Sequence, residues 1–528
     1  MNHPSRTVVE TRCGAVRGRG TNSVAFLGIP YAEAPVGELR FAAPVPRRRW
    51  KGVRDATAYG PTPQRRPFDA FSLMPEPTIP GDDILNLNVF TPAPNLPTAK
   101  LPVLVWIHGG GYVGGSPSNP WYDGKSFNAR GIVTVSVGYR LGFEGFGYIE
   151  DAPAPANRGL LDQILALHWV RENIEQFGGD PHRVTIAGQS AGGGSVLCLM
   201  TSPRARGLFQ QAIAQSPATL EGTAERALER SAEFAARAGI PNTLAGWSSL
   251  STERIDELMA EFPLPLEQVP NVPTTLARQF ASVSGTERVS SALVPFAPVI
   301  DDDVLPTSVN RALAKGASAE IPLLIGCTRN ELTAMLKPMR EVWRSYDPRT
   351  VLNAAGFPKL AAWSFVREHP ELHDDTALVL GQLATAGLFH MPMIRRVQSR
   401  LRARVAVACD VETGVTVGAK KASTWVYEFA WPKPSTGFAD HCAEIPFVFN
   451  CLDDGDVPRI FGTTSPPLTL ASTMHSDWVR FITTGQPGWN PWNEGNRGRI
   501  YGADENGMVR TAKPMRLEIA LLKSVKDS

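Results

Sequence analysis

Short apolar runs alternate with helical patterns through the first half of the chain. Runs at 103–107, 132–137 and 184–187 have the length of strands and are rich in Val and Ile. Before the third run, apolar residues recur at three- and four-residue steps over about 160–176, which predicts a helix that ends at a pair of glycines. Strands that alternate with helices predict an α/β fold with a central, mainly parallel sheet.

The second half of the chain predicts further strands and two helical insertions. The additional strand candidates lie at 212–214, 322–325 and 425–429. From about 218 to 290 and from about 340 to 404 the pattern becomes helical, and we expect these insertions to cover the carboxyl edge of the sheet and to shape a pocket. Gly and Pro are spread evenly, without a linker or an internal repeat, so we expect a single domain over 1–528.

Composition and charge narrow the functional classes. The 528 residues are 43% hydrophobic and 20% charged, as in ordinary globular proteins. The 53 Lys and Arg nearly balance the 51 Asp and Glu, so nothing indicates a nucleic-acid or membrane partner. Residues 1–14 are too polar for a secretory signal, and no unbroken apolar stretch of about 18 residues predicts a transmembrane helix.

The six cysteines are scattered along the chain. They form no C-x-x-C pair and no repeated spacing with histidine, which disfavours a structural zinc site. In a chain without a secretory signal, free thiols in a reducing cytosol are the simplest interpretation. We therefore expect a cytoplasmic protein without disulfides.

The pentapeptide 188–192, Gly-Gln-Ser-Ala-Gly, is the strongest indication of chemistry. It lies between a strand candidate and a helical pattern, which is the context of a nucleophile elbow. There, small residues on both sides of a serine allow a sharp turn that lifts the hydroxyl above the sheet. Ser190 is therefore the candidate nucleophile, and the alternative is that Ser190 only caps a glycine-softened helix.

A nucleophilic serine needs hydrogen-bond donors for the oxyanion that forms when it attacks a carbonyl group. The stretch 108–111, His-Gly-Gly-Gly, follows a strand candidate and matches the loop that supplies backbone N–H groups for this purpose. The candidate donors are Gly110, Gly111 and Ala191. A flexible strand-end loop is the alternative; a phosphate-binding loop at 124–126 is disfavoured because Asn119 stands where that motif needs its first glycine.

Ordered sequence blocks over most of the chain resemble the carboxylesterase type B family, which includes cholinesterases and bacterial para-nitrobenzyl esterases. The elbow and the glycine-rich loop are joined by blocks at 26–32, 35–41, 87–90, 139–142, 157–163, 177–181, 298–301 and 478–485. So many blocks in family order make the resemblance specific. It implies an α/β-hydrolase fold and a serine hydrolase activity that requires no metal or organic cofactor.

The resemblance also implies a catalytic triad in the order Ser, Glu, His. The family pattern for the acid, G-x-x-x-[DN]-E after a strand, matches 326–331 and indicates Glu331. The histidine block, H-x-x-E-I-P-[YF]-V-F, matches 441–449 and indicates His441 as the base. The acidic run 301–303 is a competing source of the acid, but it lies in a structural turn of the family, and Asp440 is expected to be only a neighbour.

Departures from the family pattern bear on compartment and substrate. The disulfide cysteine of secreted members is replaced by Ile84, in agreement with the expected free thiols. Many members have Glu before the nucleophile, whereas this chain has Gln189, and the stretch 68–83 lacks the tryptophan with which cholinesterases hold a quaternary ammonium group. Both features disfavour a cationic substrate.

We therefore expect a carboxylesterase whose partner is a small neutral ester, hydrolysed through an acyl-enzyme on Ser190. Where cholinesterases narrow the acyl pocket with aromatic residues, the stretch 291–294 reads Ser-Ala-Leu-Val, so acyl groups longer than acetyl should be accepted. An aryl carbamate or amide hydrolase with the same triad is the alternative function. An inactive adhesion module of the same fold is disfavoured because the triad is complete. The natural substrate, the stereoselectivity and the oligomeric state stay open.

Overall fold

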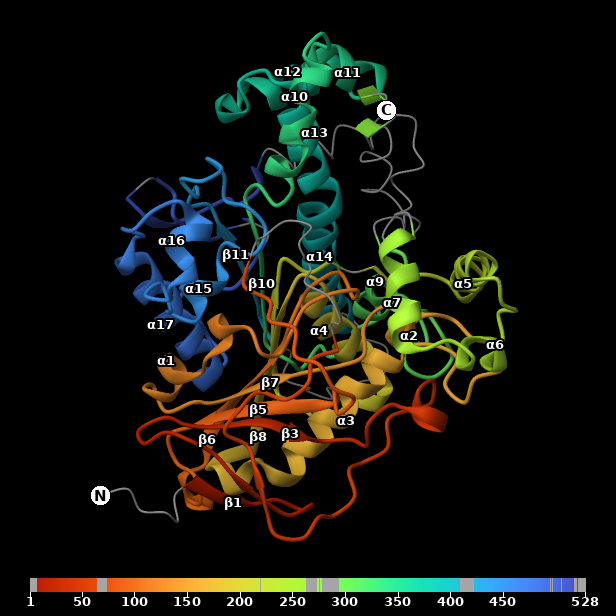
Figure 1. The fold of residues 1–528 in the computed structure, drawn as a ribbon. Coiled ribbons are helices and arrows are strands. Elements are labelled where there is room, and N and C mark those ends of the chain that lie inside the picture. The colour runs from red at the N-terminus through yellow and green to blue at the C-terminus, as the bar shows by residue number, and fades with distance from the viewer. Residues whose placement is uncertain are drawn as a thin grey trace.

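A large mixed sheet forms the centre of the molecule (Figure 1). The computed structural model describes residues 7–63, 74–218, 220–262, 294–408, 422–493, 497–504 and 506–516, with the single positions 273, 274, 276, 277, 495 and 520. Within these residues the sheet has ten strands: β3 (Val24–Pro30), β5 (Asn86–Thr91), β6 (Leu101–Ile107), β7 (Val133–Val137), β8 (Gly179–Gln189), β9 (Gln211–Gln215), β10 (Leu323–Thr328), β11 (Thr424–Phe429), β12 (Gly498–Tyr501) and β13 (Val509–Ala512). Their order is β13-β12-β11-β10-β9-β8-β6-β7-β5-β3. A separate small sheet contains β1 (Val8–Glu10), β2 (Ala15–Arg17) and β4 (Val53–Asp55).

The sheet is parallel from β7 to β12 and antiparallel at both edges, where β3, β5 and β13 lie. The strands predicted from the sequence correspond to β6 through β11, which confirms the predicted α/β class. These strands are buried on both faces and therefore read as continuous apolar runs. The strands at the edges do not read as continuous apolar runs. In β5, buried asparagines alternate with apolar residues, and β13 is partly exposed.

Alternate residues of the central strands enter two separate cores, since successive side chains of a strand point to opposite faces. On β6, Val103, Val105 and Ile107 pack into one core, and Leu104 and Trp106 pack into the other. The first core is covered by α3 (Arg158–Asn173) and α4 (Ala191–Thr201). The second is covered by α15 (Ile445–Val448), α16 (Asp456–Phe461) and α17 (Leu468–Thr484), on the other side of the sheet in Figure 1.

Both predicted insertions are helical where the structure describes them. The first contains α5 (Ala224–Ala238), α6 (Leu244–Ser248) and α7 (Thr252–Glu261), and most of its remainder lies outside the described residues. The second contains α10 (Arg340–Trp343), α11 (Pro348–Ala354), α12 (Lys359–Arg367), α13 (Thr376–Thr385) and α14 (Met391–Ala408). In Figure 1 the helices α10 to α12 project farthest from the sheet. Helix α13 packs against the 3-10 helix Thr333–Met339 that follows β10, so the second insertion covers the carboxyl end of that strand.

The helical stretch Thr376–Ala403 is long and apolar enough to cross a membrane. Polar and charged residues interrupt its apolar run, so it is not the unbroken apolar stretch whose absence was noted in the sequence. In this fold, 94% of its apolar window is buried inside the protein. The stretch is therefore placed as a core helix, and a π-helical turn at Ala386–His390 joins its two halves.

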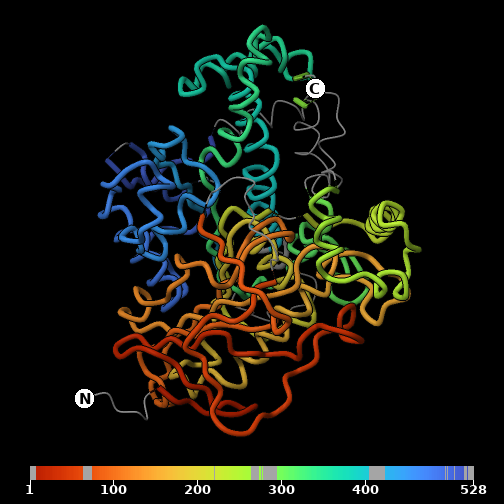
Figure 2. The backbone as a smooth tube through the Cα atoms, in the orientation of Figure 1, coloured from red at the N-terminus to blue at the C-terminus, as the bar shows by residue number. Residues whose placement is uncertain are grey.

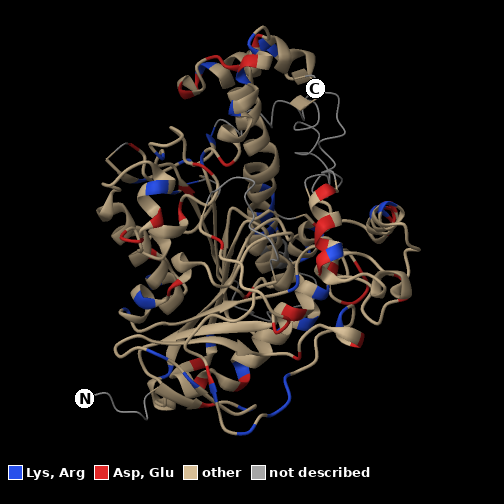
Figure 3. Cartoon of the chain, in the orientation of Figure 1, with Lys and Arg blue, Asp and Glu red and all other residues tan. Residues whose placement is uncertain are grey.

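The C-terminal part of the chain returns to pack against the N-terminal half. Figure 2 shows the blue C-terminal part beside the orange segment that contains α1 (Lys125–Asn128). At this contact the Ser126 hydroxyl donates to the Asn450 carbonyl oxygen at 3.2 Å. Figure 3 shows positively and negatively charged residues interspersed along the outer helices and loops, as the near balance of charges predicts.

A fully buried ion pair anchors the segment between β7 and α2 (Gly142–Phe146). Both side chains of the Arg140–Asp162 pair are 0% exposed, and the guanidinium donates to both carboxylate oxygens at 2.7 and 2.9 Å. Its remaining Nη1 donates to the carbonyl oxygens of Arg40 and Ala42. Burial opposes the charge of Arg140, but the adjacent Asp162 carboxylate raises its pKa above the ordinary value. The pair therefore ties α3 to the segment that supports the loop after β6.

Asp162→Asn should destabilise the fold by about 3–5 kcal/mol, because it leaves the Arg140 charge buried without its counter-ion. Urea unfolding monitored by tryptophan fluorescence measures the loss. Glu341→Gln is the matched control, since the Glu341–Arg344 pair is 87% and 83% exposed, and it should change stability by less than about 0.5 kcal/mol. Equal effects of the two substitutions would contradict a structural role for the buried pair.

Candidate active site

Ser190 occupies a strained turn between β8 and α4. Its backbone has φ 57° and ψ −122°, a combination that a non-glycine residue adopts only when the surrounding structure enforces it. Its side chain makes no capping hydrogen bond to α4, so the alternative of a simple helix cap is wrong. The residue is 8% exposed at the carboxyl end of the strand. This is the geometry expected of a nucleophile elbow.

The glycines on both sides of Ser190 are required because the backbone at the start of α4 lies very close to the backbone at the end of β6. A Cβ atom on Gly192 would lie 2.0 Å from the carbonyl oxygen of Ile107. A Cβ atom on Gly188 would lie 2.5 Å from the backbone of Gly192. The start of α4 is therefore pressed against the end of β6, and only residues without a side chain fit there.

The loop after β6 lies directly beside the serine. A Cβ atom on Gly109 would lie 3.0 Å from Cβ of Ser190, and Gly110 has φ 105°, which favours glycine. Among the described residues, none accepts a hydrogen bond from the N–H group of Gly110 or Gly111. Ala191 is the first residue of α4, so its N–H has no acceptor within the helix. The glycine loop therefore approaches Ser190 at Gly109, and Ala191 directly follows the serine.

His108, at the start of this loop, has a supporting role. Its ring stacks on Tyr139 with centroids 4.5 Å apart, and the Tyr139 hydroxyl donates to the His108 carbonyl oxygen at 2.8 Å. Burial lowers the pKa of His108 to about 4, so the ring is neutral at physiological pH. A neutral, stacked ring of this kind holds the glycine loop in place.

Glu331 and His441 meet on the loops that follow β10 and β11. The side chains form a short hydrogen bond between Nδ1 of His441 and Oε2 of Glu331, and the His441 N–H donates to the Glu331 carbonyl oxygen at 3.2 Å. The second carboxylate oxygen, Oε1, accepts from the Thr328 N–H at 2.8 Å. The Phe389 ring, from the π-helical turn, lies 5.0 Å from the imidazole. Both carboxylate oxygens are therefore occupied, and Nε2 is the ring nitrogen left to face the elbow.

Electrostatics favours a charged acid and a basic imidazole. Burial by itself would raise the pKa of Glu331, but the adjacent His441 lowers it below the ordinary value. Burial alone would lower the pKa of His441, but the Cys442 thiol and the Glu331 carboxylate raise it well above 6.5. The pair can therefore hold a positive charge on the imidazole when it gains a proton.

The competing acids and histidines are engaged elsewhere. Asp301 accepts the N–H groups of Asp303, Val304 and Leu305 in a turn. Asp440 forms a buried ion pair with Lys433 at 3.0 Å. Buried His390 and His475 each bond a backbone carbonyl oxygen, and His369 pairs with Glu371. Within the described ranges, no group of three or more His, Cys, Asp and Glu side chains is arranged to hold a metal ion.

Two neighbours of His441 were not predicted as part of the site. Nε2 of His441 lies 3.3 Å from the amide nitrogen of Gln189, and the Cys442 thiol lies 3.3 Å from the amide oxygen. In the part of the chain that is described, no hydrogen bond joins Ser190 to His441. Glu444 is also buried there, and burial together with Glu331 raises its pKa to about 7. The H-x-x-E block contains Cys442 and Glu444, but nothing in its spacing indicates the contact with Gln189.

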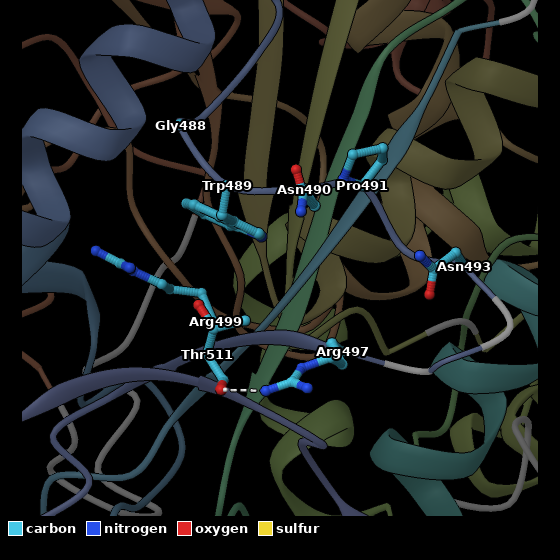
Figure 4. Close-up of a pocket in the computed structure, with 8 residues that line it drawn as sticks. All are labelled: Gly488, Trp489, Asn490, Pro491, Asn493, Arg497, Arg499 and Thr511. Atoms are coloured by element: carbon cyan, nitrogen blue, oxygen red, sulfur yellow. Dashed lines mark hydrogen bonds between the residues drawn. The ribbon is translucent and has the colours of Figure 1, made fainter.

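One cavity lies away from these residues (Figure 4). Its volume is about 550 Å³, and residues in and beside β12 and β13 line it: Gly488, Trp489, Asn490, Pro491, Asn493, Arg497, Arg499 and Thr511. The Trp489 carbonyl oxygen accepts a hydrogen bond from Trp425, near the start of β11. Ser190 and Glu331 instead follow the carboxyl ends of their strands, so this cavity is at the opposite end of the sheet.

Comparisons with known proteins agree with this architecture. Residues 5–516 match the profile of the carboxylesterase family. A para-nitrobenzyl esterase of Bacillus subtilis is 35% identical over 93% of this chain and 93% of its own length. Carboxylesterase 1E of Mus musculus is 33% identical over 92% of this chain and 87% of its own length.

Solved structures show the same similarity in three dimensions. A carboxylesterase of Geobacillus stearothermophilus superimposes with a TM-score of 0.77 and 31% identity, covering 98% of this chain and 100% of the other. A para-nitrobenzyl esterase gives a TM-score of 0.74 with 30% identity, covering 98% and 99% of the two chains. The predicted α/β-hydrolase fold and the predicted family are thereby confirmed.

If Ser190 and His441 act as nucleophile and base, Ser190→Ala and His441→Ala should each lower kcat/KM by about 10,000-fold or more, since such residues act as a unit. Glu331→Gln should lose less if the imidazole keeps its orientation. A para-nitrophenyl ester assay measures the losses, and peptide mass mapping after fluorophosphonate treatment should find the adduct on Ser190.

Asp302→Asn is the control for these substitutions, because Asp302 is exposed and should be dispensable. An adduct on another serine would overturn the choice of nucleophile. Loss of turnover in Asp302→Asn with retention in Glu331→Gln would overturn the choice of acid.

Proposed function

Because the chain belongs to the carboxylesterase family and hydrolyses carboxylic esters as a serine enzyme, we propose that Ser190, Glu331 and His441 are its triad and that neutral esters are its substrates. The observation that carries this proposal is the short hydrogen bond between His441 and Glu331 beside the strained elbow of Ser190. These groups come from three different loops at the carboxyl edge of the sheet. An arrangement of this kind has the parts that acyl transfer requires.

The proposed reaction has two halves. Ser190 Oγ attacks the ester carbonyl carbon while its proton passes to Nε2 of His441, and Glu331 stabilises the imidazolium. The oxyanion binds the N–H groups of Gly110, Gly111 and Ala191, each contributing about 3 kcal/mol to transition-state stabilisation. His441 then protonates the leaving alcohol. Water, deprotonated by His441, attacks the acyl-enzyme and releases the acid and free Ser190.

The acyl side of the proposed site borders the glycine loop. Val294 is the member of the stretch 291–294 that the structure describes, and the other three lie outside the described residues. Its Cγ1 lies 3.3 Å from the position that a Cβ on Gly111 would take, and the residue is 8% exposed. A small aliphatic residue beside the oxyanion donors supports a pocket that accepts acyl chains longer than acetyl.

The charge at the site supports uncharged substrates. Gln189 is a neutral residue, 1% exposed, directly before the nucleophile. The stretch 68–83 contains no tryptophan that could bind a quaternary ammonium group. A positively charged alcohol group therefore has no evident partner.

Butyrate and hexanoate esters should exceed acetate in kcat/KM by roughly 10- to 50-fold, because each buried methylene contributes about 0.8 kcal/mol. Val294→Phe should narrow the pocket and remove this preference. Val342→Phe, at a position 61% exposed on α10, is the control. A panel of para-nitrophenyl esters measures both variants.

The same panel includes a carbamate, an anilide, acetylcholine and its neutral analogue 3,3-dimethylbutyl acetate. Clear preference for acetate, or for acetylcholine over the analogue, would contradict the proposed pocket. Faster turnover of the carbamate or the anilide than of the matched ester would favour the alternative function.

We further propose a cytoplasmic location, with no nucleic-acid or membrane partner. In support, the five cysteines that the structure describes are all unpaired, and Cys409 lies outside the described residues. Alkylation followed by intact-mass measurement should count six free thiols without reduction. A pair of cysteines that reacts only after reduction would contradict the cytoplasmic assignment.

A further inference from the structure

The side chain of Gln189 bridges two groups at the centre of the site. Its amide oxygen faces the Cys442 thiol at 3.3 Å, and its amide nitrogen faces Nε2 of His441 at 3.3 Å. Gln189 and Cys442 are 1% and 7% exposed. The same amide oxygen lies 3.0 Å from the position that a Cβ on Gly109 would take, so the amide is confined on a third side.

The contacts of Cys442, Gln189 and His441 are made with the amide oxygen of Gln189 toward Cys442 and its nitrogen toward His441. A thiol has a hydrogen to donate, so it directs the amide oxygen of Gln189 toward Cys442. The NH₂ group is thereby turned toward His441, and an amide nitrogen is a donor only. Since Nδ1–H of His441 is directed at the Glu331 carboxylate, Nε2 carries the lone pair that accepts from Gln189.

We propose that Gln189, oriented by the Cys442 thiol, is a positioning residue that donates to Nε2 of His441 and keeps the resting imidazole in its neutral, Nδ1-protonated tautomer. The inference rests on the proposed function, in which His441 is the base. It assigns a role to a glutamine and a cysteine that take no part in bond making or breaking.

The backbone at Cys442 supports this orienting role. Its φ is 68°, in the left-handed region that a side chain other than that of glycine, Asn or Asp rarely adopts. A glycine, which adopts this conformation readily, would present only a hydrogen atom to Gln189, whereas Cys442 presents a thiol. Cys442 thus combines a strained backbone with the side-chain contact described above.

The hydrogen bond from Gln189 stabilises only the neutral form of His441. A donor that faces Nε2 stabilises the neutral ring and must turn away or be lost when Nε2 gains a proton. The Ser190 hydroxyl differs, because a hydroxyl can donate to the neutral ring or accept from the charged one. Gln189 therefore restrains the basicity that Glu331 confers.

The other ionisable groups around His441 are accounted for. Glu331 and Cys442 touch the ring, Glu444 follows on the same segment, and His390 approaches from the π-helical turn through Glu331. His108, on the glycine loop, is neutral because burial lowers its pKa to about 4. Of these groups, Cys442 contacts Gln189 directly.

The pH dependence of kcat/KM for a neutral ester tests the proposal. Only the neutral imidazole accepts the serine proton, so activity is lost as the pH falls through the His441 pKa, which lies above 6.5. Gln189→Met removes the donor and should move this acid limb upward by about half a unit to one unit. Gln189→Glu replaces the donor by a charged acceptor and should move the limb farther in the same direction.

Cys442→Ala tests whether the Cys442 thiol acts on His441 through Gln189. Alanine frees the amide to turn its oxygen toward the charged ring, which should move the acid limb upward, but it also removes the thiol that itself raises the pKa of His441, which should move the limb downward. The part that depends on Gln189 is therefore the difference between Cys442→Ala in the unaltered protein and in the Gln189→Met background, and this difference should be upward. In the Gln189→Met background the same substitution should show only the direct effect of the thiol, a downward shift, so the two substitutions should not be additive. Cys451→Ala, which truncates another buried thiol, 4% exposed, should leave the limb in place.

A measurement that does not need activity separates this inference from the proposed triad. In Ser190→Ala protein, the downfield Nδ1–H proton resonance of His441 can be titrated by NMR, and Gln189→Met should still raise the midpoint. An unchanged midpoint in Gln189→Met would overturn the proposed role of Gln189, even if His441→Ala is inactive. Additive shifts of Gln189→Met and Cys442→Ala would likewise overturn the proposed link from Cys442 through Gln189 to His441. Retained activity in His441→Ala would instead overturn the triad.

Discussion

The close approach of two backbone segments, after β6 and after β8, is the constraint on which the site depends. Gly192 lies against the Ile107 carbonyl oxygen with no room for a side chain, and Gly109 lies against Ser190. Ser190 has a positive φ at this contact, and the described residues include no hydrogen-bond acceptor for the N–H groups of Gly110 and Gly111. Such strain persists only because the sheet holds both strand ends rigidly, with β6 and β8 paired along their length.

A second set of contacts brings the acid and the base to that elbow. The loops after β10 and β11 are joined by reciprocal bonds, in which the Asn330 N–H donates to the Ala439 carbonyl oxygen and the Ala439 N–H donates to the Asn330 side chain. The His441 N–H then donates to Glu331. These bonds orient the imidazole before the side chains interact, so Glu331 has only to select the tautomer. Preorganisation of this kind is what makes an electrostatic site effective.

The polar groups around His441 have opposite effects on the pKa of its imidazole ring. Glu331 favours the charged ring, whereas the donor of Gln189 favours the neutral ring, and a base that must both accept and return a proton needs an intermediate strength. Low local polarity strengthens each of these bonds, because Gln189 and Glu331 are both almost completely buried. A substitution at one of these positions therefore changes the reaction through the imidazole and not through a contact with substrate.

The sequence by itself predicted the parallel strands and the glycine-flanked turn at Ser190, because continuous apolar runs and glycine spacing are local properties, and Glu331 and His441 were indicated by the resemblance to the family. It did not determine β12, β13 or the antiparallel strands at the other edge, whose partly polar segments become strands only by pairing with a neighbour. It predicted a helical pattern over about 340–404, but only the tertiary structure shows that the apolar helix Thr376–Ala403 is buried inside the protein. Only the tertiary structure decided that Gln189 and Cys442 meet, since they are 253 positions apart and a hydrogen bond depends on distance in space.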